Sequence, residues 1–233
     1  DVVLVGRKIN NSIALKNMPF QQQRLKCMFE KGKLFYAEYS LRLFIYLLFK
    51  RMDAICAIDL DTILPCLYIS NIKKILRVYD AHELFCEVKE IATRPAIYKV
   101  WKAIERYSVP KFQLGYTVNR PIADEFNKMY GVHYEVIRNI ALLRDLLPIT
   151  PAEKFILYQG AVNEGRCFET LIPAMKDVNC QLIICGDGNF MEQAKTLVKE
   201  NMLEDKVIFK GKVPPDELRR ITQQAYLGIT LFD

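Results

Sequence analysis

Short apolar runs alternate along the chain with longer segments of helical period. The runs are almost entirely apolar, as strands buried on both faces of a parallel sheet are. We therefore predict two series of strands. They cover residues 2–5, 54–58, 75–78, 116–118 and 135–137, and then residues 155–158, 181–185, 207–209 and 227–232.

Segments of helical period lie between these runs and predict helices. They cover residues 34–51, 95–109, 121–129, 168–177, 189–201 and 215–225. Alternation of strands and helices at this spacing is typical of right-handed βαβ units, which build parallel sheets with helices on both faces. The predicted fold class is α/β, with two Rossmann-like, doubly wound lobes.

A break in this pattern separates the two series. Residues 139–153 contain two prolines and show no clear period, which predicts a linker. The net charge changes sign at the same place. Residues 1–140 carry 22 Lys and Arg against 14 Asp and Glu, whereas residues 141–233 carry 11 against 13. We therefore predict one lobe over residues 1–143 and a second lobe over residues 144–233.

The composition is that of a globular protein, with 51% hydrophobic and 26% charged residues. No window of about 20 apolar residues is present, so no membrane-spanning helix is predicted. The seven cysteines form no C-x-x-C pair, and several lie in apolar runs, Cys56 and Cys185 among them. Buried, reduced thiols of a cytoplasmic protein are the expected result. With only two histidines in the chain, no metal site is expected.

The first 51 residues are the most basic part of the chain, with ten Lys and Arg and three acidic residues. A basic surface of this kind could meet an anionic membrane surface or a phosphorylated acceptor. The alternative is an ordinary solvated surface with spare lysines. Nucleic acid is not an expected partner, because no known module of interleaved aromatic and basic residues is present.

Candidate chemistry lies in the loops that follow strands, because ligands of doubly wound sheets bind beyond the carboxyl ends of the strands. The loop YQGAVNEGRCFETL, residues 158–171, combines glycines with Arg166 just before a predicted helix. Glycine permits close approach of the backbone, and a helix N-terminus with an arginine suits a diphosphate. The alternative is a tight turn with a solvent-facing arginine.

Two further loops in the second lobe carry weaker signals. CGDGNF, residues 185–190, is either a ligand loop or a turn in which Asp187 caps the next helix. FKGKVPPDEL, residues 209–218, indicates the start of a helix, with a proline pair ahead of two acidic residues.

The loop VYDAHELF, residues 78–85, brings His82 to a strand exit beside carboxylates. His82 is therefore the better of the two histidines for chemistry. The alternative is a histidine at the surface or at a helix start. His133 lies in a turn and is expected on the surface.

These loops resemble those of a known family. The segments ILYQGAVNEGRCFETLIPAM, QLIICGDGNFMEQAKTLVKENMLEDKVIFKGKVPPDEL and AYLGITLF closely resemble the donor-binding lobe of the family 4 glycosyltransferases, which have the GT-B fold of two Rossmann-like lobes. YDAHELF and YTVNRPIADEFNKMYGVHYEVIRNI resemble the N-terminal, acceptor-side lobe. The resemblance covers nearly the whole chain and is more specific in the second lobe.

The resemblance implies roles for residues in the loops. The first loop would meet the donor diphosphate, the second the nucleotide side of the cleft, and the third the nucleobase. His82 would face the donor sugar across the cleft. The seven implied donor-binding positions are Gly160, Arg166, Gly186, Asp187, Gly188, Lys212 and Val213.

The implied activity is transfer of a sugar from a nucleotide-diphosphate sugar to a hydroxyl of a saccharide or lipid-linked acceptor. Such transfer belongs to glycan or polysaccharide biosynthesis. The resemblance also implies a retaining enzyme that needs no metal ion or other cofactor. The expected location, from the reduced cysteines, is the cytoplasm, and the basic first lobe could lie at the inner face of the membrane.

The sequence departs from the family pattern in three places. Ala161 stands where many members have an arginine. The family's E-x7-E element would follow Asp233, and its Gly-rich first loop would precede Asp1, so both lobes are expected to be incomplete. Two alternatives stay open: a catalytically silent GT-B-like partner or scaffold protein, and a GT-B-like nucleotide-sugar epimerase. A pair of NAD-binding lobes is not expected, because no G-x-G-x-x-G follows a strand.

Overall fold

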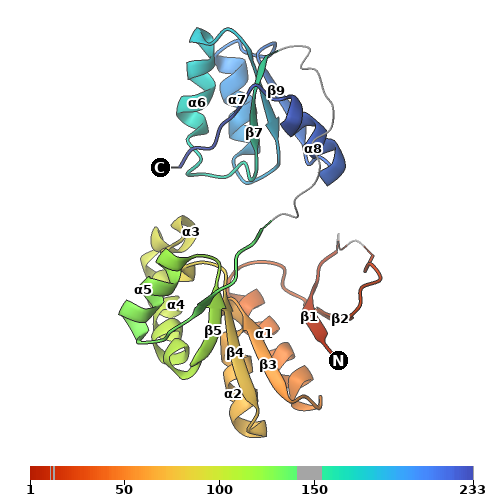
Figure 1. The fold of residues 1–233 in the computed structure, drawn as a ribbon, viewed down its shortest axis with the longest axis vertical. Helices are drawn as coiled ribbons and strands as arrows, with labels where there is room; N and C mark the ends of the chain where they lie inside the picture. Colours follow the sequence, from red (N-terminus) through yellow and green to blue (C-terminus); the bar gives the residue numbers. More distant parts are fainter. Residues whose placement is uncertain (11, 13, 141–153, 233) are drawn as a thin grey trace. The chain divides into compact units, whose positions relative to one another are not determined.

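The computed structural model describes residues 1–10, 12, 14–140 and 154–232. It divides the chain into two compact units, Asp1–Ala141 and Leu142–Asp233, which we describe separately (Figure 1). The predicted lobe boundary after residue 143 and most of the predicted linker lie outside the described residues.

The N-terminal unit contains two parallel sheets. The larger sheet has the strand order β3-β4-β5-β6. Its strands are β3 Ala54–Ile58, β4 Leu76–Ala81, β5 Leu114–Thr117 and β6 Glu135–Val136. The smaller sheet pairs β1 Val3–Lys8 with β2 Gln21–Lys26. The first predicted strand therefore forms, but it lies outside the sheet to which the next four belong.

Five helices accompany these strands. They are α1 Gly32–Leu48, α2 Ile63–Lys73, α3 Lys89–Ala92, α4 Pro95–Ser108 and α5 Arg120–Tyr130. α1, α4 and α5 confirm the helices predicted in this half, within a few residues at their ends. α2 was not predicted, because its sequence ILPCLYISNIK is largely apolar and shows no helical period. Pro65 lies in its first turn, where the missing N–H removes no helical hydrogen bond.

In the described part of this unit, the helices that accompany the larger sheet pack on one of its faces. Tyr79 in β4 points to the covered face, where its ring contacts the rings of Phe112, Phe126 and Tyr134. Figure 1 shows α1, α2, α4 and α5 behind the strands. β3 alternates accordingly between exposed and buried residues.

Strand order explains this asymmetry. β3, β4, β5 and β6 are neighbours in their sequence order, and crossovers between parallel strands are right-handed in nearly all proteins. When each new strand is added on the same side of the previous one, right-handed crossovers place every connecting helix on the same face of the sheet. Helices on the second face would need strands added in the opposite direction. Alternation of strands and helices in the sequence carries no information about that order.

The C-terminal unit is built on one parallel sheet with the strand order β10-β7-β8-β9. Its strands are β7 Phe155–Gln159, β8 Gln181–Cys185, β9 Val207–Gly211 and β10 Leu227–Gly228. Its helices are α6 Phe168–Ala174, α7 Met191–Glu200 and α8 Pro215–Gln224. Every element predicted in this half is present. β10 is shorter than the predicted strand 227–232, and α6 passes into a 3-10 turn at Met175–Asp177.

All seven cysteines are free thiols. Cys66, Cys86 and Cys185 are buried as predicted, but Cys56 is exposed, because it lies on the uncovered face of the sheet. None of the helices in the described ranges is long and apolar enough to cross a membrane.

Candidate functional site

Three loops of the C-terminal unit meet at the carboxyl edge of its sheet. They follow β7, β8 and β9, and main-chain hydrogen bonds join them. The N–H of Gly160 donates to the carbonyl oxygen of Cys185 over 3.0 Å, and the N–H of Gly186 donates to that of Gly211 over 2.8 Å. The predicted donor-binding loops therefore form one continuous edge, as parallel topology requires.

This close packing leaves no room for a side chain at two of the predicted glycines. A Cβ on Gly186 would lie 1.7 Å from the carbonyl oxygen of Gly160, and a Cβ on Gly188 would lie 2.3 Å from that of Val162. Gly160 and Gly186 also have φ values of 151° and 153°, in the region that favours glycine. Side chains are excluded here, so main-chain groups form the part of the edge that a ligand would meet.

Arg166 lies in the first loop, two residues before α6. Its guanidinium carbon stacks 4.0 Å from the ring centroid of Phe232, and the residue is partly buried. The backbone turns sharply around it, with φ values of 81° at Gly165 and 52° at Cys167. Arg166 is therefore held in place and is not a freely solvated turn residue. A fixed cation beside a helix start is suited to an anionic ligand.

Asp187 and Lys212 bring the second and third loops together. Nζ of Lys212 lies 3.7 Å from a carboxylate oxygen of Asp187, and both side chains are exposed. Asp187 also accepts a hydrogen bond of 2.8 Å from the N–H of Gly188. The alternative that Asp187 caps the next helix is wrong, because Phe190 is the N-cap of α7 and no side chain caps it. Val213 follows Lys212 and is partly buried.

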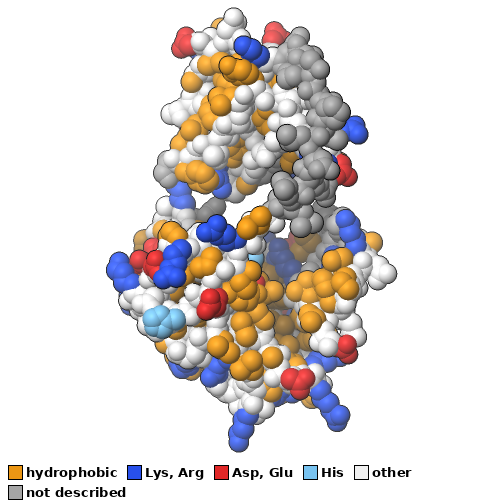
Figure 2. All heavy atoms as spheres, in the orientation of Figure 1, with side chains coloured by type: hydrophobic (Ala, Val, Ile, Leu, Met, Phe, Trp, Pro, Cys, Tyr) orange, Lys and Arg blue, Asp and Glu red, His pale blue; other side chains and the backbone are white. Residues whose placement is uncertain are grey.

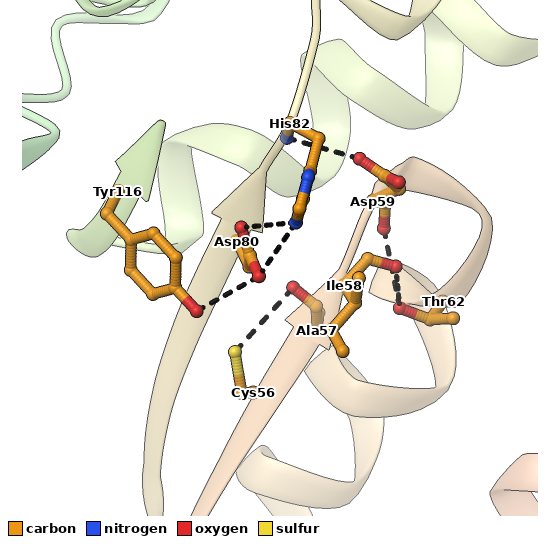
Figure 3. A network of polar contacts seen from close by, with 8 residues as sticks. All are labelled: Cys56, Ala57, Ile58, Asp59, Thr62, Asp80, His82 and Tyr116. Atoms are coloured by element: carbon orange, nitrogen blue, oxygen red, sulfur yellow. Dashed lines mark hydrogen bonds and ion pairs between the residues drawn. The ribbon is translucent and has the colours of Figure 1, made fainter. Parts of the chain in front are cut away.

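A second polar cluster lies at the carboxyl edge of the N-terminal unit (Figure 3). His82 follows β4, and its Nε2 lies 3.1 Å from the carboxylate oxygens of Asp80. Tyr116 of β5 donates its hydroxyl hydrogen to Asp80 Oδ2 over 3.0 Å. The Asp80 side chain is 11% exposed and the His82 side chain 43% exposed. A nearly buried carboxylate thus holds a ring that a ligand can reach.

Asp59 supports the same histidine from the neighbouring strand. Its carboxylate accepts a hydrogen bond of 3.2 Å from the N–H of His82, and its own N–H donates to the carbonyl oxygen of Asp80 over 2.9 Å. Asp59 has a φ of 54° and a ψ of 173°, a conformation that residues other than glycine rarely adopt. Burial raises the pKa of the Asp59 carboxyl group.

Asp61 lies two residues further along the same strand exit. Burial raises the pKa of its carboxyl group to about 6, and repulsion from Asp59 adds to the effect. The sequence AIDLD already shows both aspartates after a strand, but the hydrogen bond between Asp59 and His82 depends on the pairing of β3 with β4. Tyr116 was missed for the same reason, since β5 brings it to Asp80.

The contact with Asp80 favours one tautomer of the His82 ring. A carboxylate at Nε2 favours the tautomer that carries its proton there, which leaves Nδ1 as an acceptor. His133, by contrast, is exposed as predicted and contacts Asn127. Among the residues that the structure describes, no three His, Cys, Asp or Glu side chains are grouped so as to hold a metal ion.

A known protein family matches the C-terminal unit. Residues 141–231 match the family model described as "Glycosyl transferases group 1". The matched segment contains all three interlocked loops of the C-terminal unit. No curated protein sequence matches the chain.

Several solved structures share the fold of the chain. Sucrose-phosphate synthase from Thermosynechococcus elongatus is 17% identical, with a TM-score of 0.73 over 97% of this chain and 64% of that one. TarM from S. aureus, in complex with fondaparinux, α-GlcNAc-glycerol and UDP, is 16% identical, with a TM-score of 0.61 over 81% and 39%. HepE from Anabaena, in complex with UDP and glucose, is 15% identical, with a TM-score of 0.61 over 90% and 60%.

The chain thus spans between 39% and 64% of the length of these three structures. At such identities the likeness shows the fold, which is the predicted α/β fold of GT-B type. The chain therefore has a GT-B fold, and its residues 141–231 match the group 1 glycosyl transferases.

Proposed function

We propose that this protein transfers a sugar from a nucleotide-diphosphate sugar to an acceptor hydroxyl. The observation that carries the proposal is the edge formed by three interlocked strand-exit loops in the C-terminal unit. These loops lie within residues 141–231, the segment that matches the group 1 glycosyl transferases. The UDP complexes of TarM and HepE, which share the fold, support a nucleotide donor.

The donor would bind along this edge, and each loop would take one part of it. The first loop takes the diphosphate, with Arg166 as its cation. The second takes the nucleotide side, and the third takes the base through Lys212 and the backbone at Val213. Because glycines line much of the edge, main-chain groups supply a large share of the contacts. The proposed donor-binding residues are Gly160, Arg166, Gly186, Asp187, Gly188, Lys212 and Val213.

The proposed chemistry needs no metal ion. As the bond to the anomeric carbon breaks, negative charge grows on the diphosphate, and Arg166 stabilises it as a forked cationic donor. The departing phosphate takes the proton of the acceptor hydroxyl, and the new bond forms on the face that the phosphate leaves. That course retains the anomeric configuration. Retention, like membership of family 4, rests on the resemblance of the motifs.

His82 is the proposed catalytic residue of the N-terminal unit. With Nε2 held by Asp80, its Nδ1 can accept a hydrogen bond from a hydroxyl of the donor sugar. A ring fixed by a buried carboxylate loses little freedom when a ligand binds, which favours stabilisation of the transition state. Asp80, Tyr116 and Asp59 act on the sugar only through this ring.

The proposed setting is glycan or polysaccharide biosynthesis in the cytoplasm, with a saccharide or a lipid-linked molecule as the acceptor. The complex of TarM with fondaparinux and α-GlcNAc-glycerol supports a saccharide-like acceptor. Peripheral contact with an anionic membrane stays a prediction from the ten Lys and Arg among the first 51 residues.

Calorimetry of the full-length protein with UDP, GDP and ADP tests the donor site. We expect one diphosphate to bind and Arg166→Ala to weaken its binding by roughly 1.5–3 kcal/mol, the range for a charged hydrogen bond. Lys195→Ala is the matched control, since Lys195 lies on the surface of α7 and pairs with Glu192. Absence of binding by all three nucleotides, or equal binding by the Arg166 variant, would contradict the proposed donor site.

A second candidate function is a catalytically silent partner protein with the same fold. The observation that favours it is Ala161, which removes an arginine that many family members carry in the first loop. Product analysis separates the two functions. A protein that binds a nucleotide diphosphate but releases no sugar from the matching donor, with or without saccharide acceptors, is the silent form.

A further inference from the structure

Helix α1 of the N-terminal unit is apolar on both its inner and its outer side. Four buried residues form the inner side: Phe35, Tyr39, Leu43 and Leu47. Four large side chains on the outer side are between 48% and 80% exposed: Leu34, Leu41, Ile45 and Phe49. Spacings of seven and four residues place these four in one row along the helix and its last turn. We call this row the outer α1 face.

An exposed apolar row is unusual for a helix at the surface of a protein. Such helices carry polar residues on the side away from the core, whereas a helix that is apolar all round belongs in a core or in a membrane. Helix α5 follows this rule, because its exposed residues include Arg120, Asp124 and Lys128. Contiguous apolar surface in water marks an interaction site, so we expect the outer α1 face to have a partner.

Basic side chains lie at both ends of the outer α1 face. Two exposed cations stand at the start of α1 and two just after its end: Lys31, Lys33, Lys50 and Arg51. Nζ of Lys50 lies 5.1 Å from the ring centroid of Tyr46, so this cation stays beside the helix. Figure 2 shows Lys and Arg side chains projecting where α1 and α2 end and β3 begins. The two lysines at the start of α1 oppose the helix dipole, so helix stability does not explain them.

Charge decides between the two partners that suit an apolar helix face, a second copy of the chain and a lipid bilayer. An antiparallel pair of α1 helices would bring the basic start of one helix to the basic end of the other. A parallel pair would bring each basic end to the same end of the other copy. Both arrangements place like charges together, which opposes association. An anionic bilayer complements both ends and offers apolar chains to the row between them.

We infer that the outer α1 face docks the protein on an anionic lipid bilayer, with α1 lying in the plane of the membrane surface. The apolar row enters the boundary between headgroups and acyl chains, and the cations at its two ends contact lipid phosphates. Glu38 lies near the row, but its carboxylate pairs with Arg42 over 2.7 Å and accepts hydrogen bonds from the N–H groups of Met28 and Phe29. Docking through α1 is independent of sugar transfer, so its failure leaves the proposed function unaffected.

Flotation of the full-length protein with lipid vesicles tests this docking. We expect binding to vesicles that mix phosphatidylglycerol with phosphatidylcholine and no binding to phosphatidylcholine alone. Leu41→Gln/Ile45→Gln should weaken binding roughly tenfold to a hundredfold, because each side chain loses the apolar half that the bilayer would bury. Lys50→Gln/Arg51→Gln should weaken it roughly 25-fold, about fivefold for each cation.

Two controls make the result specific. Met202→Gln is the matched control, since Met202 of the C-terminal unit is 85% exposed, and it should bind vesicles as the parent does. Circular dichroism of Leu41→Gln/Ile45→Gln should match the parent, because glutamine is a good helix former. The inference is overturned if the parent does not float with mixed vesicles, or if this double variant floats as well as the parent. It is also overturned if ultracentrifugation shows a dimer that the double variant loses, which makes a second copy the partner.

Discussion

Close packing of two strand-exit loops predicts that Gly186→Ala strongly destabilises the C-terminal unit. The new Cβ would lie 1.7 Å from the oxygen and 2.9 Å from the carbon of the Gly160 carbonyl group. Both are main-chain atoms, so no side-chain rotation relieves the clash. The φ of 153° at Gly186 adds strain for any L residue.

The expected loss of stability follows from the two hydrogen bonds that the variant must break and from the backbone strain that it adds. Separation of the loops breaks the hydrogen bonds from Gly160 to Cys185 and from Gly186 to Gly211. Each contributes roughly 0.5–1.5 kcal/mol, and the backbone strain costs about 1–3 kcal/mol. We expect a loss of about 4 kcal/mol in the free energy of unfolding of this unit, or roughly a thousandfold in its opening equilibrium.

Peptide-resolved hydrogen exchange measures this loss. The single tryptophan, Trp101, lies in the N-terminal unit, so its fluorescence does not report on the loops. Amides of β8 should exchange roughly a thousandfold faster in Gly186→Ala. Gly228→Ala is the matched control, because no atom lies within 4 Å of its new Cβ, and it should change stability by less than about 0.5 kcal/mol. Unchanged exchange of β8 in Gly186→Ala would show that this contact does not hold the loops together.

Two further predictions concern the N-terminal unit. Because burial raises the pKa of Asp61 from 3.8 to about 6, the folded state binds this proton more tightly than the unfolded state, and stability falls as pH rises from about 4 to 6. Asp61→Asn should therefore raise the free energy of unfolding at pH 7 by about 3 kcal/mol, measured by urea titration of Trp101 fluorescence; a less stable variant would contradict this. Tyr116→Phe removes a hydrogen bond to Asp80 and should lower kcat of sugar transfer about tenfold with the donor KM unchanged. A raised KM at constant kcat would instead place Tyr116 in direct contact with the donor.

The helices and strands of the C-terminal unit could be predicted because the apolar runs, the turn residues and the helix-start residues all indicate the same boundaries. Its strands are apolar runs, and glycines follow β7 and β8 directly, at Gly160 and Gly186. The proline pair before α8 and the acidic first turn at Asp216 and Glu217 mark the helix start that the structure shows. Parallel strands then bring the loops to one edge whatever their order, so the convergence of the three loops could be predicted without knowledge of the strand order.

Features of the N-terminal unit were harder to predict, because two elements lack a clear sequence pattern and the contacts of His82 depend on strand pairing. The strand β2, with the polar sequence QQQRLK, has no apolar run to reveal it, and α2 is too uniformly apolar to show a period. His82 was predicted from its place after β4. Asp59 and Tyr116, which hold it directly or through Asp80, come from two other strands, and only the pairing of β3 and β5 with β4 brings them together.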